Sequence, residues 1–375
     1  MDFSITEDQA MLQDSVAKFI QNDYDFDARQ EAAASDLGFS RDRWTEFTEL
    51  GWAAVPFGED DGGLDGGPVE LMLLMEEFGK GLVIEPYLPC IVLAGGVLKR
   101  TASDEQKAHW LAPIIEGSKL AALAYAEPQA RFDLNDTATT ATRDGDDFVL
   151  NGTKCVVLNG GAADTLVVSA RTSGERTDSS GISLFVVDAT SAGIERKQYP
   201  TVDARQAADI TLTDVRIPAT QLLGNIDDGL ETLSAVIDDA IICVSAEAVG
   251  IMQALNYRTL EYSKSRVQFG VPIASFQALQ HRMVEMFMIA EQTRSLLLHA
   301  VMAQDEDDRE AAKASIHALK VQVGTEGRRL GEEAVQLHGG MGVSWELDVA
   351  HYFKRLTMID TLFGNADHHL EAYPI

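Results

Sequence analysis

The chain lacks the features that mark disulfide-rich and membrane-spanning proteins. Its three cysteines, Cys90, Cys155 and Cys243, are widely spaced, and no Cys-x-x-Cys pair occurs. We therefore expect free thiols in a reducing compartment. No run of about 18 apolar residues is present, so no membrane-spanning helix is predicted. The N-terminus has no positive segment followed by an apolar run, so we expect no signal peptide and a cytoplasmic location.

Positive charge is scarce. The sequence has 30 Lys and Arg residues against 59 Asp and Glu residues, which gives a net charge of −29. Such an acidic chain is a poor candidate for binding nucleic acid or anionic membranes. A ligand that carries phosphate would need a local site of basic side chains, backbone N–H groups or helix N-termini. The simplest interpretation of the acidity is solubility or a salty habitat.

Metal ligands are also few. His368 and His369 are adjacent, and adjacent residues on a helix point about 100° apart. No other His or Cys completes a spacing typical of metal ligands, so no metal site is expected.

The patterns along the chain predict a helical, then a β-rich, then a helical region. A chain of 375 residues can form two or three packed domains. Thr6 and Gln9 have the form of a capping box, and helical periodicity follows them. Further helices are predicted over 41–50, 69–79 and 103–117, with a glycine-rich loop at 58–67. The predicted fold class is α+β, with domains at 1–118, 119–225 and 226–375.

Short β-type segments fill the central region, at 148–157, 165–170, 182–187 and 210–212. Within the first of them, Asn151-Gly152 predicts a tight hairpin between two strands. The last region predicts long helices over 232–263, 278–304 and 311–337, each with an apolar stripe, which is typical of an antiparallel bundle. Met283, Met286 and Met288 are expected to fill its core.

Six short motifs occur in an order typical of one enzyme family. They are Leu50-Gly-Trp52 with its glycine-rich loop and Met75-Glu-Glu-Phe-Gly79, Ala126-Glu-Pro128, Leu150-Asn-Gly-Thr-Lys154, Arg266-Val-Gln-Phe-Gly270 with Phe276-Gln277, and Gln336-Leu-His-Gly-Gly-Met-Gly342. Through them the chain resembles the acyl-CoA dehydrogenases over nearly its whole length. More narrowly, segments 125–131, 246–250 and 275–281 resemble the small subunit of pimeloyl-CoA dehydrogenase and related bacterial two-component enzymes.

The resemblance implies an architecture and a chemistry. The architecture is an N-terminal helical domain, a central β-barrel-like domain and a C-terminal four-helix bundle. The cofactor would be FAD, and the reaction would be α,β-desaturation of an acyl-CoA, as in β-oxidation of fatty acids or steroid side chains. Electron-transfer flavoprotein would be the electron acceptor, and a homologous catalytic subunit would complete a heterotetramer.

The turn Leu362-Phe363-Gly364-Asn365 departs from the family at its most important position. The family usually has Tyr-Glu-Gly-Thr there, and the Glu removes the α-proton of the substrate. Phe363 cannot accept a proton, although its backbone N–H could still polarise the thioester carbonyl. General-base catalysis contributes roughly 10²- to 10⁴-fold, so its loss is serious.

Some family members carry the base early in the first long C-terminal helix. That position is Ala240 here, with Ile241 where the family has Arg, so the second location is empty too. Asp239 lies one residue earlier, about 100° around the helix, and would reach the substrate only if the helix were distorted. Alternatively, Asp238 and Asp239 are favourable charges near a helix N-terminus. Glu247 lies further along and is expected to be structural.

Positions that contact the flavin ring in the family have also changed. Ala126, Val156 and Leu158 stand where the family has Thr, Trp and Thr. In contrast, the residues that in the family bind the nucleotide across the dimer interface are largely kept. They are Arg266, Gln268, Phe269, Gln277, Gln336, Gly339, Gly340 and Asn365. Arg266 could instead form a surface ion pair, and Gly339-Gly340 could be an ordinary helix C-terminus.

Three hypotheses remain open from the sequence. The chain could be the subunit that lacks the base and completes a partner's FAD site. It could be a self-sufficient homomeric enzyme that uses Asp239. It could also be a structural or regulatory homologue without turnover.

Overall fold

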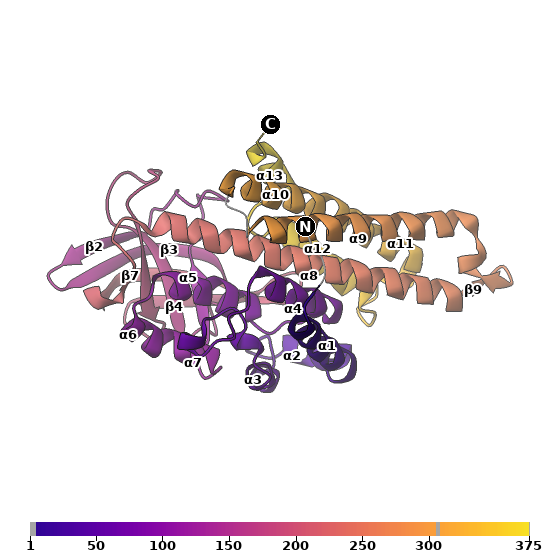
Figure 1. Cartoon of the computed structure of the whole chain (residues 1–375), viewed down its shortest axis with the longest axis horizontal. Helices are drawn as coiled ribbons and strands as arrows, with labels where there is room; N and C mark the ends of the chain where they lie inside the picture. Colours follow the sequence, from indigo (N-terminus) through magenta and orange to yellow (C-terminus); the bar gives the residue numbers. More distant parts are fainter. Residues whose placement is uncertain (1–4, 305–307, 375) are drawn as a thin grey trace. The chain divides into compact units, whose positions relative to one another are not determined.

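The computed structural model describes residues 5–304 and 308–374, which belong to two compact units (Figure 1). We call them the sheet unit, Glu31–Gly67 with Ile84–Ala240, and the bundle unit, Met1–Gln30 with Pro68–Val83 and Ile241–Ile375. The first long helix and one later N-terminal helix thus belong with the C-terminal helices. The domain limits expected at 118 and 225 remain predictions.

The described helices and strands follow the α, β, α order expected from the sequence. The N-terminal helices are α1 (Glu7–Asn22), α2 (Phe26–Ala33), α3 (Arg41–Glu49), α4 (Pro68–Gly81), α5 (Gly96–Thr101), α6 (Asp104–Gln106) and α7 (Ala112–Ile115). The strands are β1 (Ala121–Ala124), β2 (Thr140–Asp144), β3 (Asp147–Leu158), β4 (Thr165–Arg171), β5 (Ile182–Asp188), β6 (Ile194–Pro200), β7 (Gln206–Pro218), β8 (Leu222–Leu223), β9 (Val267–Gln268) and β10 (Val271–Pro272). The C-terminal helices are α8 (Gly229–Ser265), α9 (Gln277–Ala303), α10 (Arg309–Gln322), α11 (Arg328–His338), α12 (Val349–Thr361) and α13 (Ala366–Ala372).

The first helix begins where its capping signal predicts. The Thr6 hydroxyl accepts a hydrogen bond from the Gln9 N–H at 3.2 Å, and the Gln9 side chain accepts one from the Thr6 N–H at 2.9 Å. These bonds satisfy two N–H groups that a helix start otherwise leaves without partners. The capping box read from the sequence is therefore confirmed.

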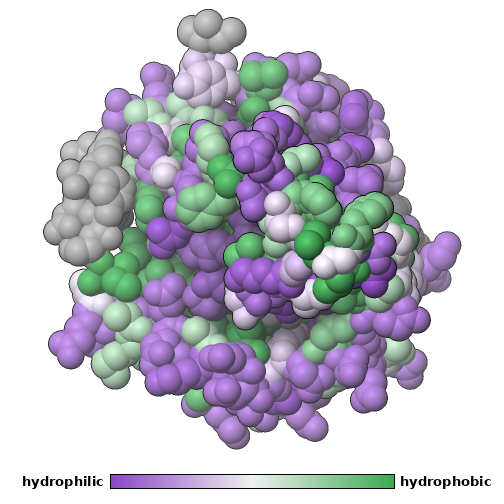
Figure 2. All heavy atoms as spheres, turned by 90° about the vertical axis from the view of Figure 1, so that its right-hand side faces the viewer, coloured by the Kyte–Doolittle hydropathy of each residue, from purple (hydrophilic) through white to green (hydrophobic). Residues whose placement is uncertain are grey.

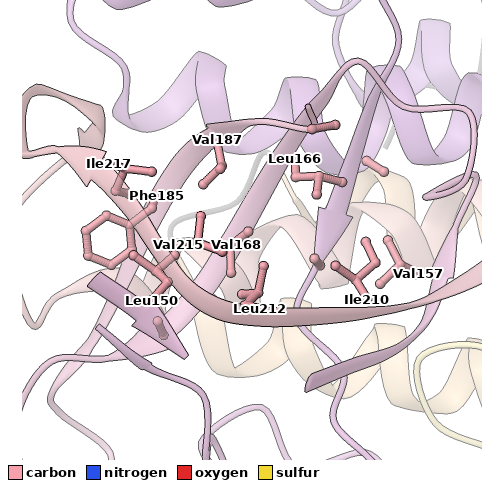
Figure 3. Packing of buried hydrophobic residues seen from close by; sticks show 14 of the residues in the cluster. Leu150, Val157, Leu166, Val168, Phe185, Val187, Ile210, Leu212, Val215 and Ile217 are labelled. Carbon is pink, nitrogen blue, oxygen red and sulfur yellow. The ribbon is translucent and has the colours of Figure 1, made fainter. Parts of the chain in front are cut away.

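The large sheet of the described residues has the order β6-β7-β3-β2-β4-β5-β8, with β1 paired in parallel to β4. Inward-facing residues of several strands form one apolar core, shown in Figure 3. Its members include Leu150, Leu166, Val168, Phe185, Val187, Ile210, Leu212, Val215 and Ile217. β4 and β5 are buried on both faces, which explains why their sequences are mostly apolar and do not alternate regularly between apolar and polar residues.

The hairpin predicted at Asn151-Gly152 is wrong. β3 runs straight through both residues, and the hairpin lies earlier, where β2 turns into β3 at Gly145 and Asp146. The Asn151 side chain instead pairs with the neighbouring strand β7. Its Nδ2 donates to Asp214 Oδ1 at 3.1 Å, and its Oδ1 accepts from the Asp214 N–H at 2.8 Å.

Gly152 has a separate reason to be glycine. A Cβ atom there would lie 2.4 Å from the Thr139 hydroxyl oxygen, and the backbone φ is 155°. The strand pairing also shifts register between Leu150 and Gly152. The glycine therefore permits an irregularity in a continuous strand, not a turn.

A buried ion pair joins the segment that follows β1 to β3. Lys154 Nζ donates to Glu127 Oε1 at 2.6 Å and to Ser169 Oγ at 3.1 Å, and both charged side chains are almost fully buried. Burial opposes ionisation of Glu127, but Lys154 and further hydrogen bonds outweigh it and lower the Glu127 pKa to about 2. The lysine and glutamate of two family motifs are thus structural partners.

The bundle unit is built around close contact between α4 and α8. A Cβ atom at Gly79 would lie 2.1 Å from the Glu247 carbonyl oxygen, and one at Gly250 would lie 1.9 Å from the Glu76 carbonyl oxygen. The two glycines therefore let the helix backbones touch. Next to them, the side chain of Glu247 is buried and receives two hydrogen bonds from Arg355 of α12, which confirms its expected structural role.

Two details of the bundle differ from expectation. The single helix predicted over 311–337 is divided, because a π-helical turn at Val323–Gly327 separates α10 from α11. Met286 is buried as expected, but Met288 is 51% exposed. Among the described residues, none of the helices is both long and apolar enough to cross a membrane.

Candidate active site

The turn at the expected base position is strained and holds no proton acceptor. α12 ends at Thr361, Phe363 has a φ of 58° and Gly364 a φ of 107°, and α13 begins after Asn365. The Phe363 side chain is 9% exposed. A non-glycine residue with positive φ costs of order 1–3 kcal/mol and persists where the surroundings fix it.

The nearest carboxylate in sequence does not replace the missing base. Asp360 Oδ1 accepts a hydrogen bond from the Ala366 N–H at 3.0 Å, at the start of α13. A Cβ atom on Gly324 would lie 2.1 Å from the same oxygen. Asp360 therefore caps a helix and packs against α10's π-helical extension.

The second base position of the family is also without a carboxylate. Ala240 and Ile241 are buried in α8. The neighbouring Asp239 pairs with Arg100 of α5, whose Nη2 lies 2.5 Å from Asp239 Oδ2. Burial raises the pKa of Asp239, and the charge of Arg100 counteracts part of this. The ion pair gives Asp239 a structural partner that the sequence did not reveal.

Replacing Asp239 with asparagine is expected to leave the rate of acyl-CoA oxidation unchanged. The carboxylate is already bound by Arg100, and loss of a true general base would lower the rate roughly 10²- to 10⁴-fold. Steady-state kinetics of Asp239→Asn, with Asp238→Asn as the matched control, measure this. A hundredfold loss in Asp239→Asn alone would assign the base to this residue.

The positions expected to meet the flavin ring lie close together in the sheet unit. The Cys155 N–H donates to the Ala126 carbonyl oxygen at 2.9 Å, beside a register shift between Lys154 and Val157. Val156, in this bulge, is 45% exposed with a φ of 50°. A bulge re-aims side chains at functional sites, but here it presents an aliphatic one.

Four expected nucleotide contacts gather on the β9–β10 hairpin and the start of α9. Arg266 and Gln268 are exposed, Phe269 is 92% exposed with a φ of 55°, and Gln277 is the first residue of α9. Arg266 makes no ion pair with any residue in 5–304 or 308–374, so the alternative of a surface ion pair has no support there.

The second cluster of expected contacts lies next to this hairpin. The Tyr262 ring stacks on His338 at 4.4 Å, and its hydroxyl donates to the His338 carbonyl oxygen at 3.3 Å. Gln336 is therefore near the end of α8 that leads into Arg266. Gly339 has a φ of 60°, which favours glycine.

Gly340 has no conformational or packing reason within the described chain to be glycine. A Cβ atom there would meet no described atom within 4 Å. The open space beside Gly340, together with the unpaired Arg266, fits the approach of an anionic dinucleotide to the backbone. The residues of this surface therefore fit the nucleotide part of FAD.

Asn365 does not lie near the expected contacts on the β9–β10 hairpin. Its side-chain oxygen accepts from the His368 N–H at 3.1 Å and caps α13. Figure 1 draws α13 well apart from the β9 hairpin, although both belong to the bundle unit. The expected nucleotide contacts therefore do not all lie together within one chain. The cap that Asn365 forms on α13 is a structural reason for an asparagine at this position.

Comparison with known proteins decides the family. The N-terminal, middle and C-terminal domain models of acyl-CoA dehydrogenase match residues 6–118, 122–215 and 227–372. The chain belongs to the acyl-CoA dehydrogenase family. Members of this family are FAD-dependent oxidoreductases, so the resemblance read from the motifs is confirmed, as are the fold and the cofactor.

Individual relatives cover essentially the whole chain. A probable acyl-CoA dehydrogenase YngJ from Bacillus subtilis is 31% identical, over 98% of this chain and 97% of its own. The solved butyryl-CoA dehydrogenase from Megasphaera elsdenii is 27% identical, with a TM-score of 0.91 over 99% and 98% of the two chains. A steroid ACAD structure, Tcur3481-Tcur3483, is 26% identical, with a TM-score of 0.87 over 98% and 96%.

Sequence reasoning missed several side chains that shape this acyl-CoA dehydrogenase. Arg100, the partner of Asp239, lies 139 positions away from it, and no spacing rule links them. The contacts of Lys320 and His369 with the Phe363 turn were also missed: Lys320 Nζ donates to the Gly364 carbonyl oxygen at 2.6 Å, and His369 Nε2 lies 3.0 Å from the Phe363 carbonyl oxygen. The adjacent histidines did draw attention to His369, but only as a poor metal ligand.

Proposed function

We propose that the chain is the subunit of an FAD-dependent acyl-CoA dehydrogenase that lacks its own base and completes the FAD site of a homologous catalytic subunit in a heterotetramer. The observation that carries the proposal is Phe363 at the base position, with Asp239 held by Arg100. The aliphatic Ala126, Val156 and Leu158 support it, because the chain's own ring site has lost its polar and aromatic contacts.

The exposed apolar surface of the bundle unit supports a partner. Its large apolar side chains with at least half of their surface exposed include Phe269, Val284, Phe287, Met288, Met341, Val343 and Trp345. Figure 2 faces the end that carries β9 and shows apolar residues grouped among polar ones. Exposed apolar clusters of this kind mark protein interaction sites. The name of the similar steroid ACAD, Tcur3481-Tcur3483, joins two components.

In this arrangement the partner supplies the carboxylate that removes the α-proton. Bound FAD supplies the acceptor for the β-hydrogen, which leaves as hydride. Arg266 of this chain would neutralise the pyrophosphate, and the backbone at Gly339 and Gly340 would lie against the ADP portion. The substrate would be a bulky or dicarboxylic acyl-CoA, with electron-transfer flavoprotein as the acceptor and the cytoplasm as the location.

Co-expression with a homologue that has Glu in its Tyr-Glu-Gly-Thr turn tests the proposal. We expect a stable complex with less than one FAD per chain, and acyl-CoA oxidation at least about 10²-fold faster than by this chain alone, because only the complex has a base. Changing the partner's Glu to Gln should abolish the activity. A chain that is yellow by itself and oxidises acyl-CoA at ordinary rates would refute the proposal.

A matched pair of variants assigns the nucleotide contact. Arg266→Gln should lower the FAD content of the complex without lowering its thermal midpoint, since Arg266 pairs with no described residue. Arg328→Gln removes another exposed arginine, whose one ion pair within 5–304 and 308–374 is with Glu332 at 3.0 Å, and it should leave the FAD content unchanged.

The two other hypotheses give different outcomes. A homomeric enzyme that uses Asp239 would be active without a partner, and Asp239→Asn would inactivate it. The raised pKa of Asp239 is the observation in its favour. A purely structural homologue would show no FAD at any subunit interface.

A further inference from the structure

Two imidazole rings join the C-terminal helix α13 to α10. His369 of α13 is 2% exposed, and its Nδ1 lies 2.8 Å from Nδ1 of His317 on α10. On the other side of the ring, His369 Nε2 lies 3.0 Å from the Phe363 carbonyl oxygen. A Cβ atom at Gly364 would lie 2.6 Å from both His368 Cδ2 and His369 Nε2, so the turn also packs closely against these rings. His369 is thus the residue at which α13, α10 and the preceding turn meet.

The acceptors around His369 decide where the protons of the pair lie. A carbonyl oxygen only accepts, so the neutral His369 ring carries its proton on Nε2 and has an acceptor at Nδ1. His317 must then donate from its own Nδ1. His317 can take up a proton on Nε2 and still donate this bond. A proton on Nδ1 of His369, in contrast, makes both facing atoms donors, and the bond between the rings is lost.

A buried lysine stands beside the pair. Lys320 of α10 donates from Nζ to the Asp360 carbonyl oxygen at 2.8 Å and to the Gly364 carbonyl oxygen at 2.6 Å. Burial lowers its pKa to about 8, so Lys320 is charged in the range in which histidine titrates. Burial and this charge, together with His317 and His368, lower the pKa of His369 to about 3. Burial, Lys313 and His368 lower the pKa of His317.

The nearby carboxylates are engaged elsewhere or exposed. Asp360 of α12 accepts from the first N–H of α13 at 3.0 Å. Glu326, in the π-helical turn beside α13, pairs with Arg329 at 3.4 Å. The acidic residues of α13 itself, Asp367 and Glu371, are exposed. The side chains that act on the two rings are therefore two lysines and a third histidine, which all oppose a further positive charge.

We propose that His317 and His369 form an acid-sensitive latch that holds α13 on α10 and releases the helix when the pair takes up a second proton. Release of His369 also frees the Phe363 carbonyl, so the turn at the expected base position loses a contact together with α13. The latch consists of residues of this chain alone. It depends neither on the proposed partner nor on FAD or acyl-CoA.

The direction of the pH dependence follows from the docked and undocked states of α13. His369 has a pKa of about 3 when docked and regains its ordinary value of 6.5 when undocked. Docking is therefore at full strength above about pH 6.5 and weakens as the pH falls towards 3, because the undocked helix binds the proton more tightly. For His369 alone, the docking constant falls about tenfold between pH 7.5 and pH 5.5.

Hydrogen exchange of the purified full-length chain at pH 7.5 and pH 5.5 tests the latch. Mass spectrometry reads the exchange, and the rates are corrected for the intrinsic pH dependence of amide exchange. The N–H groups of His368 and His369, which are hydrogen-bonded to Asn365, are suitable probes. Protection in α13 should fall at least about tenfold at pH 5.5 while protection in α9 stays constant. Equal protection of α13 at both pH values, or an equal fall in both helices, would overturn the proposal.

Variants of His369 separate the latch from a general effect of acid. The amide of His369→Gln can donate to the Phe363 carbonyl oxygen and accept from His317, but it does not titrate, so protection in α13 should become independent of pH. His369→Leu loses both hydrogen bonds, and α13 should be weakly protected at both pH values. His299→Gln, which changes an exposed histidine on α9, should keep the wild-type fall. A tenfold fall that persists in His369→Gln would assign the acid sensitivity to another group and reject the latch.

Discussion

Replacing Arg355 with methionine should lower the free energy of unfolding by about 3–5 kcal/mol, because it leaves a carboxylate buried without its cation. Arg355 donates from Nε to Glu247 Oε1 at 2.8 Å and from Nη2 to Glu247 Oε2 at 2.6 Å. The two side chains are 4% and 1% exposed. Urea unfolding of the wild type and the variant measures the difference.

Two further variants make this prediction specific to burial. The double variant Glu247→Leu/Arg355→Met should be less destabilised than Arg355→Met alone, because no uncompensated charge remains. Arg329→Met breaks two ion pairs of an exposed arginine, with Glu285 and with Glu326. It should lower the free energy of unfolding by less than about 1 kcal/mol. Equal losses in Arg355→Met and Arg329→Met would contradict a dominant role for the buried charge.

Much of the helical architecture was predictable because periodicity and capping act locally. Thr6 and Gln9 begin α1, and the predicted helix over 41–50 corresponds to α3 at Arg41–Glu49. Local signals failed where distant segments decide the conformation. Asn151 has the local chemistry of a turn, but Asp214 on a neighbouring strand engages its side chain and keeps the strand continuous.

The candidate site was predictable to a different extent. The residues that differ from the family pattern, such as Phe363 and Val156, were identified from motif order alone. Their environment was not, because it depends on contacts far along the chain: Arg100 holds Asp239, and Lys320 holds the carbonyl oxygens beside Phe363. The missing base is therefore a feature of the sequence, whereas the intact backbone of the turn is visible only in the structure.

The glycine at position 250 illustrates how a family motif can be structural. From the sequence it is the one glycine in a long helix, where it weakens the helix by roughly 0.5–1 kcal/mol relative to alanine. In the structure it lies against the backbone of α4, as Gly79 does against α8. The glycine weakens α8 locally, but the close crossing of α4 and α8 leaves no room for a Cβ atom at this position.

Gly250→Ala should consequently destabilise the protein by at least about 3 kcal/mol, above the usual range for overpacking, because the obstacle is backbone and cannot rotate away. The new Cβ atom would lie 1.9 Å from the Glu76 carbonyl oxygen. Relief would require α4 and α8 to separate, which would also loosen the hydrogen bond from Gln253 Nε2 to Glu76 Oε1, now 2.8 Å. Thermal and urea unfolding measure the loss.

Gly96→Ala is the matched control for this prediction. Gly96 is the first residue of α5, and a Cβ atom there would have its nearest contact at 3.4 Å, with Val236. Its stability should change by less than about 1 kcal/mol, because alanine favours a helix and meets only ordinary van der Waals contact. If Gly250→Ala is as stable as Gly96→Ala, the backbone contact between α4 and α8 does not set the helix crossing, and the glycine needs another explanation.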